Sequence, residues 1–249
     1  MDSELLILIP LFLIISFSYS SVGLGGGSSY TAVLSIVGLS HLFIPTISLS
    51  MNVIVTASAT FQFLRHGHLK WRILLPFVIA SVPAAYIGGS LEISETVFRT
   101  ILLVSLIIVA ARIYLWKDPA FRLPDSRLFR IGLSLFLGGL LGFVAGSVGI
   151  GGGIYLVPII IITGIADTKT AAATGAAFIL INSIAGLAAR SGWTEMPWEL
   201  IIPLGATTLI GGLAGSYLGS SKWKPRTVQK LLGVIILVAI ALLAQKLIG

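Results

Sequence analysis

The sequence predicts an all-α polytopic membrane protein, and its composition and hydropathy carry that prediction. Of its 249 residues, 56% are hydrophobic and 10% are charged, whereas a soluble domain carries roughly 25% charged residues. The mean hydropathy is +1.04. Several apolar runs approach the length of about 20 residues that a helix needs to cross a bilayer. A repeated glycine motif is the third observation, and it predicts two related halves.

Ten apolar segments follow one another along the chain, five in each half. Two of them, residues 28–40 and 154–166, are too short to span a bilayer comfortably. Both directly follow a run of glycines, so each is expected to be a half-helix or the second arm of a re-entrant hairpin. The other eight segments are expected at residues 5–22, 43–63, 73–90, 98–115, 131–148, 171–189, 199–219 and 229–248.

The glycine runs are the most distinctive motif in the chain. Ser21-Val22-Gly23-Leu24-Gly25-Gly26-Gly27 returns as Ser147-Val148-Gly149-Ile150-Gly151-Gly152-Gly153. Glycine costs about 1 kcal/mol per residue in a helix relative to alanine, so both runs should interrupt a helix. In a membrane, interrupted backbone is tolerated only where protein or a water-filled cavity satisfies its polar groups. Paired interruptions in two halves of a chain indicate the central site of a transporter.

Basic residues gather in three loops, at residues 65–72, 112–130 and 220–230, which together hold twelve of the sixteen lysines and arginines. The positive-inside rule places these loops in the cytoplasm. We therefore expect a multi-pass protein of the cell (plasma or inner) membrane with both termini outside. Arg65 and Arg190, at the ends of equivalent segments, are interpreted as topology markers, with anion attraction at a cavity mouth as the alternative. The net charge of +7 follows from this topology, so nucleic acid is not an expected partner.

The same charge placement predicts that the two halves are inverted. A shift of 126 residues aligns Gly164 with Gly38 and Gly215 with Gly89, in addition to the glycine runs. Under this shift the cytoplasmic loop 65–72 matches an external loop near residues 191–198, so the halves should have opposite orientations. The expected organisation is a first transmembrane repeat at 1–118, a cytoplasmic linker at 119–130 and a second, inverted repeat at 131–249.

The helix starts behind the glycine runs form the expected site. A helix start carries unpaired N–H donors and roughly half a positive charge. Two antiparallel half-helices that meet near the midplane would direct both starts into one cavity, which suits a small oxyanion. Glycines can instead allow close helix packing, and that interpretation is preferred for the pairs Gly138-Gly139 and Gly211-Gly212.

Polar residues inside the apolar segments complete the candidate site. Asn52 and Asn182 should face the protein interior, where pocket lining and helix–helix hydrogen bonding are equally good interpretations. Serine and threonine more often bond the carbonyl groups of their own helix. The expected substrate-binding residues are Gly25, Gly26, Gly27, Ser28, Ser29, Asn52, Gly151, Gly152, Gly153, Tyr155, Thr174 and Asn182.

Several classes of function are not expected. The chain contains no cysteine, which excludes disulfides and thiolate chemistry. Two of its three histidines, His66 and His68, lie in one basic loop, so a metal site is not expected. Carboxylates that could relay protons or clamp a metal are missing from the interior of the segments. We therefore expect neither a cofactor nor enzymatic activity.

At the glycine runs the chain resembles the TauE/SafE family, the sulfite exporter or toluene-sulfonate uptake permease family. The resemblance rests on Val22–Gly27, on residues 148–158 and on Ala173-Thr174-Gly175, which is similar to the small-Thr-small element of the family. It implies transport of sulfur-containing anions such as sulfite, sulfoacetate or aromatic sulfonates. The first repeat departs from the pattern, because Ser28-Ser29-Tyr30 follows Gly27 and Ala32 stands where the second repeat has Pro158.

The sequence and the resemblance together predict a transporter of sulfite or organosulfonate anions that works by alternating access between inverted halves. A passive anion channel is the alternative, as is transport of another small oxyanion or a carboxylate. A membrane enzyme or assembly subunit is a third, less favoured class. The expected partners are a small anion and the lipid bilayer, while proton and sodium coupling and the oligomeric state are left open.

Overall fold

The computed structural model describes residues 2–21, 23–115, 126–192, 196–221, 233 and 236–245. Within these residues the fold is all-helical, as predicted. A further helix, Ile236–Gln245, lies within the expected segment 229–248. Residues 119–125 of the expected linker lie outside the described residues. The labelled helices are α1 (Asp2–Ser20), α2 (Gly27–Val37), α3 (Ile44–Arg65), α4 (Trp71–Ser90), α5 (Glu95–Leu115), α6 (Arg127–Val148), α7 (Gly153–Ile162), α8 (Thr168–Arg190) and α9 (Trp198–Ser221).

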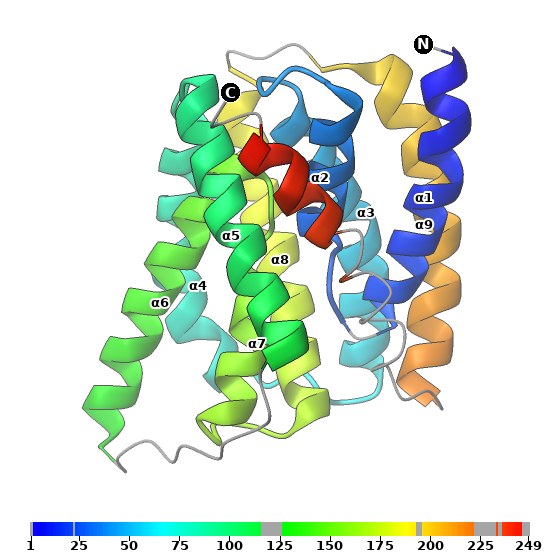
Figure 1. The fold of residues 1–249 in the computed structure, drawn as a ribbon. Helices are drawn as coiled ribbons and strands as arrows, with labels where there is room; N and C mark the ends of the chain where they lie inside the picture. The colour runs from blue at the N-terminus through cyan, green and yellow to red at the C-terminus, as the bar shows by residue number, and fades with distance from the viewer. Residues whose placement is uncertain are drawn as a thin grey trace.

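Six of these helices are long and apolar enough to cross a membrane: α3, α4, α5, α6, α8 and α9. The chain is therefore a membrane protein of the predicted class. Figure 1 shows the helices standing side by side, with turns gathered at two ends. We name the two ends lower and upper as they lie in Figure 1. The lower end holds the start of α6 and the turns at residues 66–70 and 163–167. The upper end holds the turns at residues 38–43 and 91–94. In that view α1 descends from the upper end, whereas α6 rises from the lower end.

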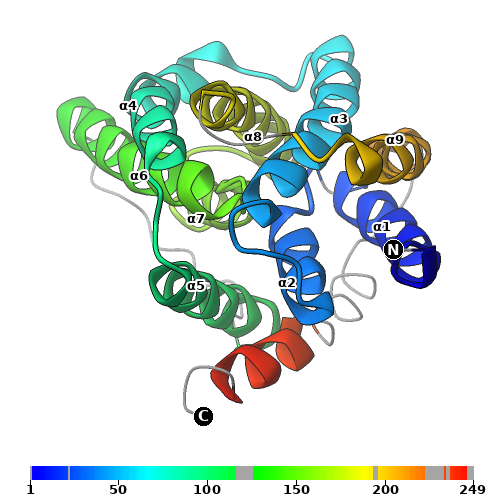
Figure 2. The ribbon, with the colours of Figure 1, turned by 90° about the horizontal axis from the view of Figure 1, so that it is seen from above.

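Two helix pairs pack along most of their lengths: α1 against α9, and α4 against α6. Figure 2 shows these pairs on opposite sides, with α3 and α8 between them. Of the six candidate spans, α8 and α3 have the most buried surface. They form the centre of the bundle, and α2 and α7 lie beside them.

Glycines allow α4 and α6 to approach each other closely. A Cβ placed on any of three glycines of α6, spaced four residues apart, would collide with a carbonyl oxygen of α4. Gly211 and Gly215 of α9 meet the backbone of α1 in the same way. This is the packing role expected of small residues in membranes, and it agrees with the interpretation given above for Gly138 and Gly211. The three contacts on α6 pair Gly138 with Phe77, Gly142 with Ser81 and Gly146 with Ala85.

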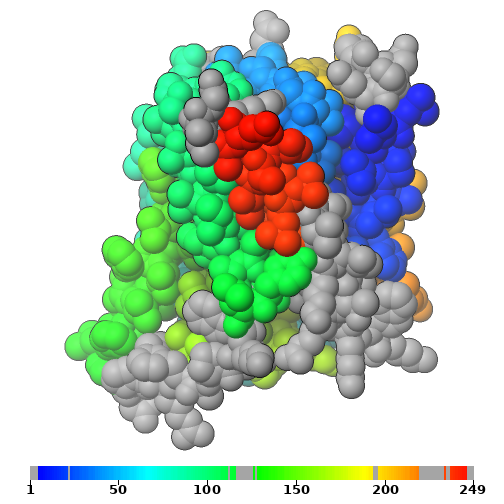
Figure 3. Space-filling model, viewed as in Figure 1, coloured from blue at the N-terminus to red at the C-terminus, as the bar shows by residue number. Residues whose placement is uncertain are grey.

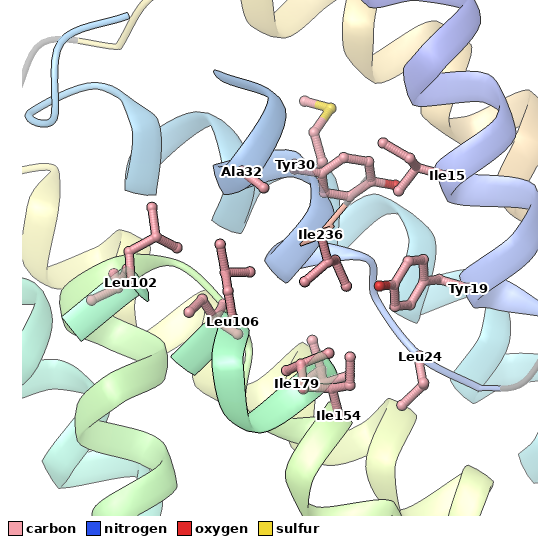
Figure 4. Packing of buried hydrophobic residues seen from close by; sticks show 14 of the residues in the cluster. Ile15, Tyr19, Leu24, Tyr30, Ala32, Leu102, Leu106, Ile154, Ile179 and Ile236 are labelled. Carbon is pink, nitrogen blue, oxygen red and sulfur yellow. The ribbon is translucent and has the colours of Figure 1, made fainter. Parts of the chain in front are cut away.

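Helix Ile236–Gln245 lies on the outside of the bundle, across α5 and α2, as the space-filling view in Figure 3 shows. It buries Ile236, Ala239 and Leu243, which recur with helical spacing on one face. Figure 4 shows Ile236 beneath α2, among Leu106, Ile179 and Tyr19. Elements from both halves of the chain therefore meet in one apolar core.

Candidate functional site

Two short helices begin at the glycine runs, as expected. The 11 residues of α2 and the 10 residues of α7 reach about 15–17 Å, roughly half of a bilayer's hydrocarbon thickness. Each is capped by a glycine in the left-handed region, Gly26 with φ +89° and Gly152 with φ +68°. Side chains rarely adopt that conformation, so the glycines set where each half-helix begins.

The two glycine runs touch each other. A Cβ added to Gly27 would lie 2.7 Å from the carbonyl oxygen of Gly149 and 2.6 Å from that of Ile150. Only a hydrogen atom fits in that space, so the α-carbon of Gly27 packs directly on the backbone of the other run. The start of α2 therefore packs against the second glycine run, between the end of α6 and the start of α7, although 126 residues separate the two runs in sequence.

Two side chains of α3 join the runs. The Ser48 hydroxyl lies 3.2 Å from the carbonyl oxygen of Gly27 and 2.8 Å from that of Gly149, and it can donate to either. One turn further along α3, the Nδ2 atom of Asn52 donates to the same Gly149 oxygen at 3.3 Å. Both side chains are fully buried. They supply donors to the Gly149 carbonyl, which follows the end of α6 and has no helical partner, while the Gly27 carbonyl also accepts from the Thr31 hydroxyl at 2.8 Å.

Asn52 also occupies the space between the runs. A Cβ on Gly25 would lie 2.5 Å from its Oδ1 atom, and one on Gly151 would lie 2.8 Å from its Nδ2 atom. Ile179 of α8 approaches the same two glycines. The bond from Nδ2 to Gly149 fixes the amide orientation, and Oδ1 then has no hydrogen-bond donor within the described residues.

The candidate residues of α8 bond within their own helix. Thr174 donates to the carbonyl oxygen of Thr170, and Asn182 donates to that of Phe178. Within the described chain, the Oδ1 atom of Asn182 and the hydroxyl of Ser183 have no partner. Thr174 thus has the intrahelical bond typical of threonine, whereas Asn182 retains a buried acceptor that can serve a ligand.

The hydroxyl groups behind the first glycine run are held by α1. Tyr19 places its hydroxyl 2.9 Å from that of Ser29 and 3.3 Å from that of Ser28. Tyr155, the corresponding polar residue of the second run, instead donates to the carbonyl oxygen of Ser105 in α5 at 3.0 Å. The structure therefore places Asn52 between the two runs and holds Ser28 and Ser29 against Tyr19 at the start of α2, while Tyr155 ties α7 to α5.

Arg190 departs from the expectation of a segment-end residue that marks topology. It ends α8 and is 2% exposed. Its Nη2 atom donates to the carbonyl oxygens of Ser147, at 2.7 Å, and Gly146, at 3.3 Å, in the last turn of α6. A cation is favoured there by the helix dipole. Arg65, at the other end of the molecule, is exposed as a topology marker should be.

Comparisons with known proteins show the family of the chain. The family model described as "Sulfite exporter TauE/SafE" matches residues 8–243. The chain belongs to the TauE/SafE family. It is similar to "Probable membrane transporter protein y4hK" of Sinorhizobium fredii, with 34% identity across 96% of this chain and 98% of the relative. It is also similar to "Probable membrane transporter protein YunE" of Bacillus subtilis, with 23% identity across 93% and 94%.

A third relative is archaeal. "Probable membrane transporter protein MJ0441" of Methanocaldococcus jannaschii is 27% identical across 75% of this chain and 74% of its own length. No solved structure matches the chain. The family model spans both glycine runs and nearly every described helix, so this TauE/SafE protein is a membrane transporter.

Sequence reasoning about this TauE/SafE protein missed two residues at the crossing, Ser48 and Tyr19. Ser48 precedes Asn52 by four residues and so lies on the same face of α3, which is one signal that could have found it. The repeat gives a second signal, because Ser48 aligns with Thr174 under the 126-residue shift. Tyr19 had no comparable signal, since its contact depends on how the chain turns between α1 and α2.

The crossing in this transporter is lined by hydrogen-bonding side chains. Among the described residues, no group of three His, Cys, Asp or Glu side chains could hold a metal ion. The side chains that meet at the crossing are serine and asparagine, with tyrosine behind them. These groups form hydrogen bonds at neutral pH without changing charge.

Proposed function

We propose that this TauE/SafE protein is a secondary transporter of small sulfur-containing anions, sulfite or organosulfonates such as sulfoacetate, that works by alternating access. The observation that carries the proposal is the contact of the buried start of α2, at Gly27, with the second glycine run at Gly149, between the end of α6 and the start of α7, where Ser48 and Asn52 join the two runs. In this proposal, the substrate binds where the two glycine runs cross.

The starts of α2 and α7 favour an anion beside the crossing, whereas the carbonyl end of α6 at Gly149 accepts hydrogen bonds from Ser48 and Asn52. The starts of α2 and α7 each contribute N–H donors and roughly half a positive charge. The polar side chains identified there are neutral, so a carboxylate does not oppose that field. The description of the family, sulfite exporter, supports a sulfur oxyanion as the substrate.

The packing supports two inverted halves. A shift of 126 residues relates α1 to α6 and α4 to α9, and it exchanges α3 with α8. The two most extensive helix–helix interfaces are α1 with α9 and α4 with α6, and the same shift exchanges one with the other. The close pair α3 and α8 maps onto itself. This is the contact pattern of a pseudo-two-fold axis that passes between α3 and α8, and we infer that the halves move about it.

The distribution of charge supports the orientation in the membrane. Among described residues, the lower end carries Arg65, Lys70, Arg72, Arg130 and Lys169 with Asp167, while the upper end carries Glu92, Glu95 and Glu199 with Arg99 and the buried Arg190. We infer from the positive-inside rule that the lower end is cytoplasmic. The protein is then a multi-pass protein of the cell membrane with both termini outside.

Transport by the purified full chain in proteoliposomes tests the substrate. We expect saturable uptake of radiolabelled sulfite or an organosulfonate, and acceleration by the same unlabelled anion on the opposite side. Acceleration by exchange is typical of a carrier and would not occur in a passive channel. Absence of uptake for every sulfur anion tested would refute the proposed substrate class. Repeating the assay with a pH gradient and with a sodium gradient identifies the coupling ion.

A further inference from the structure

A cavity of about 740 Å³ lies at the lower end of the bundle, apart from the crossing of the glycine runs. Its walls are the first turns of α4 and α6, together with Ile165 from the turn before α8. The function proposed above does not involve this cavity, because none of its lining residues contacts a glycine of either run. We refer to it as the α4–α6 groove.

The glycine pattern explains why the groove is there. The series Gly138, Gly142 and Gly146 holds α6 against α4 from Phe77 upwards. Below Gly138 the series stops, and a Cβ on Gly132 would meet nothing within 4 Å. Figure 1 shows α6 diverging from the bundle toward its start at the lower left. The two helices therefore separate over their first turns and leave an opening between them.

The groove is basic at its mouth and apolar further along. Arg72 is the second residue of α4 and Arg130 the fourth of α6, so both guanidinium groups belong to the lower rim. Leu75 and Ile79 line it further along α4, and Ile79 is about 10 Å from Arg72 along the helix. These two apolar side chains are 49% and 65% exposed. The lining contains no carboxylate.

We propose that the α4–α6 groove binds an anionic phospholipid, with its phosphate between Arg72 and Arg130 and an acyl chain along Leu75 and Ile79. Paired arginines at the edge of an apolar groove match a phosphate ester attached to a hydrocarbon chain. Among the described residues Arg72 forms no ion pair. Trp71, which is 54% exposed beside it, belongs at the headgroup level of a membrane.

Lipid retention by the purified full chain tests the role of the arginines. Native mass spectrometry would compare phosphatidylglycerol with phosphatidylcholine for the wild type, for the double variant Arg72→Gln/Arg130→Gln, and for a control, Arg65→Gln/Lys70→Gln. The control removes two charges from the same end without touching the groove. We expect the groove variant to lose preference for phosphatidylglycerol on the order of tenfold and the control to keep it. Equal retention in all three proteins, or an equal loss in the control, would overturn the proposal.

A second variant separates a lipid from a free anion. Ile79→Ser alters an exposed apolar wall and keeps both arginines, so the fold should persist. A lipid site predicts several-fold weaker retention of phosphatidylglycerol by this variant and no displacement of the lipid by inorganic phosphate. Unchanged retention together with displacement by phosphate would identify a free-anion site and contradict the proposal. Because the readout is lipid binding, its outcome is independent of whether sulfur anions are transported.

Discussion

Ser48 shows how a single hydroxyl can join two halves of a transporter. It lies on α3, in the first half, and it contacts the carbonyl oxygens of Gly27 and Gly149, one from each glycine run. The Gly149 oxygen lies just past the end of α6 and has no helical partner, and no solvent is expected at that depth. A buried acceptor without a donor costs about 1–3 kcal/mol, so this side chain stabilises the crossing.

Replacing Ser48 with alanine should therefore weaken both the fold and transport. We expect a loss of about 1–2 kcal/mol in stability, a scale consistent with hydrogen bonds measured inside membranes. The matched control is Ser50→Ala, since Ser50 is also a buried serine of α3 but donates only to Thr46 of its own helix. Thermal unfolding in detergent and uptake in proteoliposomes measure the two effects. If both variants behave alike, Ser48 does not have the joining role assigned to it.

At the scale of elements, Asp167 fixes the start of the most buried helix. Its carboxylate caps α8 by accepting from the backbone N–H groups of Lys169 and Thr170, each at 3.0 Å, and from the Thr170 hydroxyl at 2.7 Å. The bonds from Thr170 hold the pKa of Asp167 below its usual value. Asp167 lies at the lower end, outside the membrane-spanning part of α8.

Asp167→Ala should destabilise the protein by about 1 kcal/mol, the usual cost of losing such a cap. Because the folded-state pKa is lowered, the contribution is present above the unfolded pKa and is lost as the pH falls through the folded value. The difference in Tm between wild type and Asp167→Ala should thus shrink below about pH 4. Asp167→Asn is the control, since it keeps a capping oxygen and removes the titration. A difference in Tm that stays constant down to acidic pH would contradict this role.

The elements of this fold could be predicted from the sequence because long apolar runs and helix-breaking glycines are local signals. The half-helices α2 and α7 follow from the runs that end at Gly27 and Gly153, and their observed starts match the predicted ones within a residue. The partners of the site could not be predicted equally well. Tyr19 of α1 contacts Ser29 of α2, and Arg190 of α8 contacts Ser147 of α6, so both contacts depend on tertiary geometry.

At the scale of the whole molecule, the topology relates the two halves of the chain. The lower end is basic and the upper end is acidic among described residues, and α1 and α6 run in opposite directions. A pseudo-two-fold axis between α3 and α8 would exchange the membrane sides on which the two glycine runs open. That exchange is what alternating access at one shared site requires.

Cysteine accessibility tests the topology directly, because the chain has no native cysteine. Single cysteines would replace exposed residues at the upper end, Ser40 and Ser94, and at the lower end, His66 and Ser126. We expect a membrane-impermeant maleimide to label Ser40→Cys and Ser94→Cys in intact cells. Labelling of the other two should require permeabilised membranes. The reverse pattern, or labelling of one position from each end, would refute the inferred orientation.

The central claim is that transport occurs where the two glycine runs cross, and Gly27→Ala tests it most directly. The added methyl group would collide with backbone oxygens of the second run, whereas Gly132→Ala adds the same group in open space on α6. The measurement is the initial uptake rate, at equal amounts of inserted protein, of the sulfur anion that the wild type transports. We predict a loss of at least about tenfold for Gly27→Ala, since small displacements at a binding site have large effects, and a near-normal rate for Gly132→Ala. A normal rate for Gly27→Ala would contradict the claim.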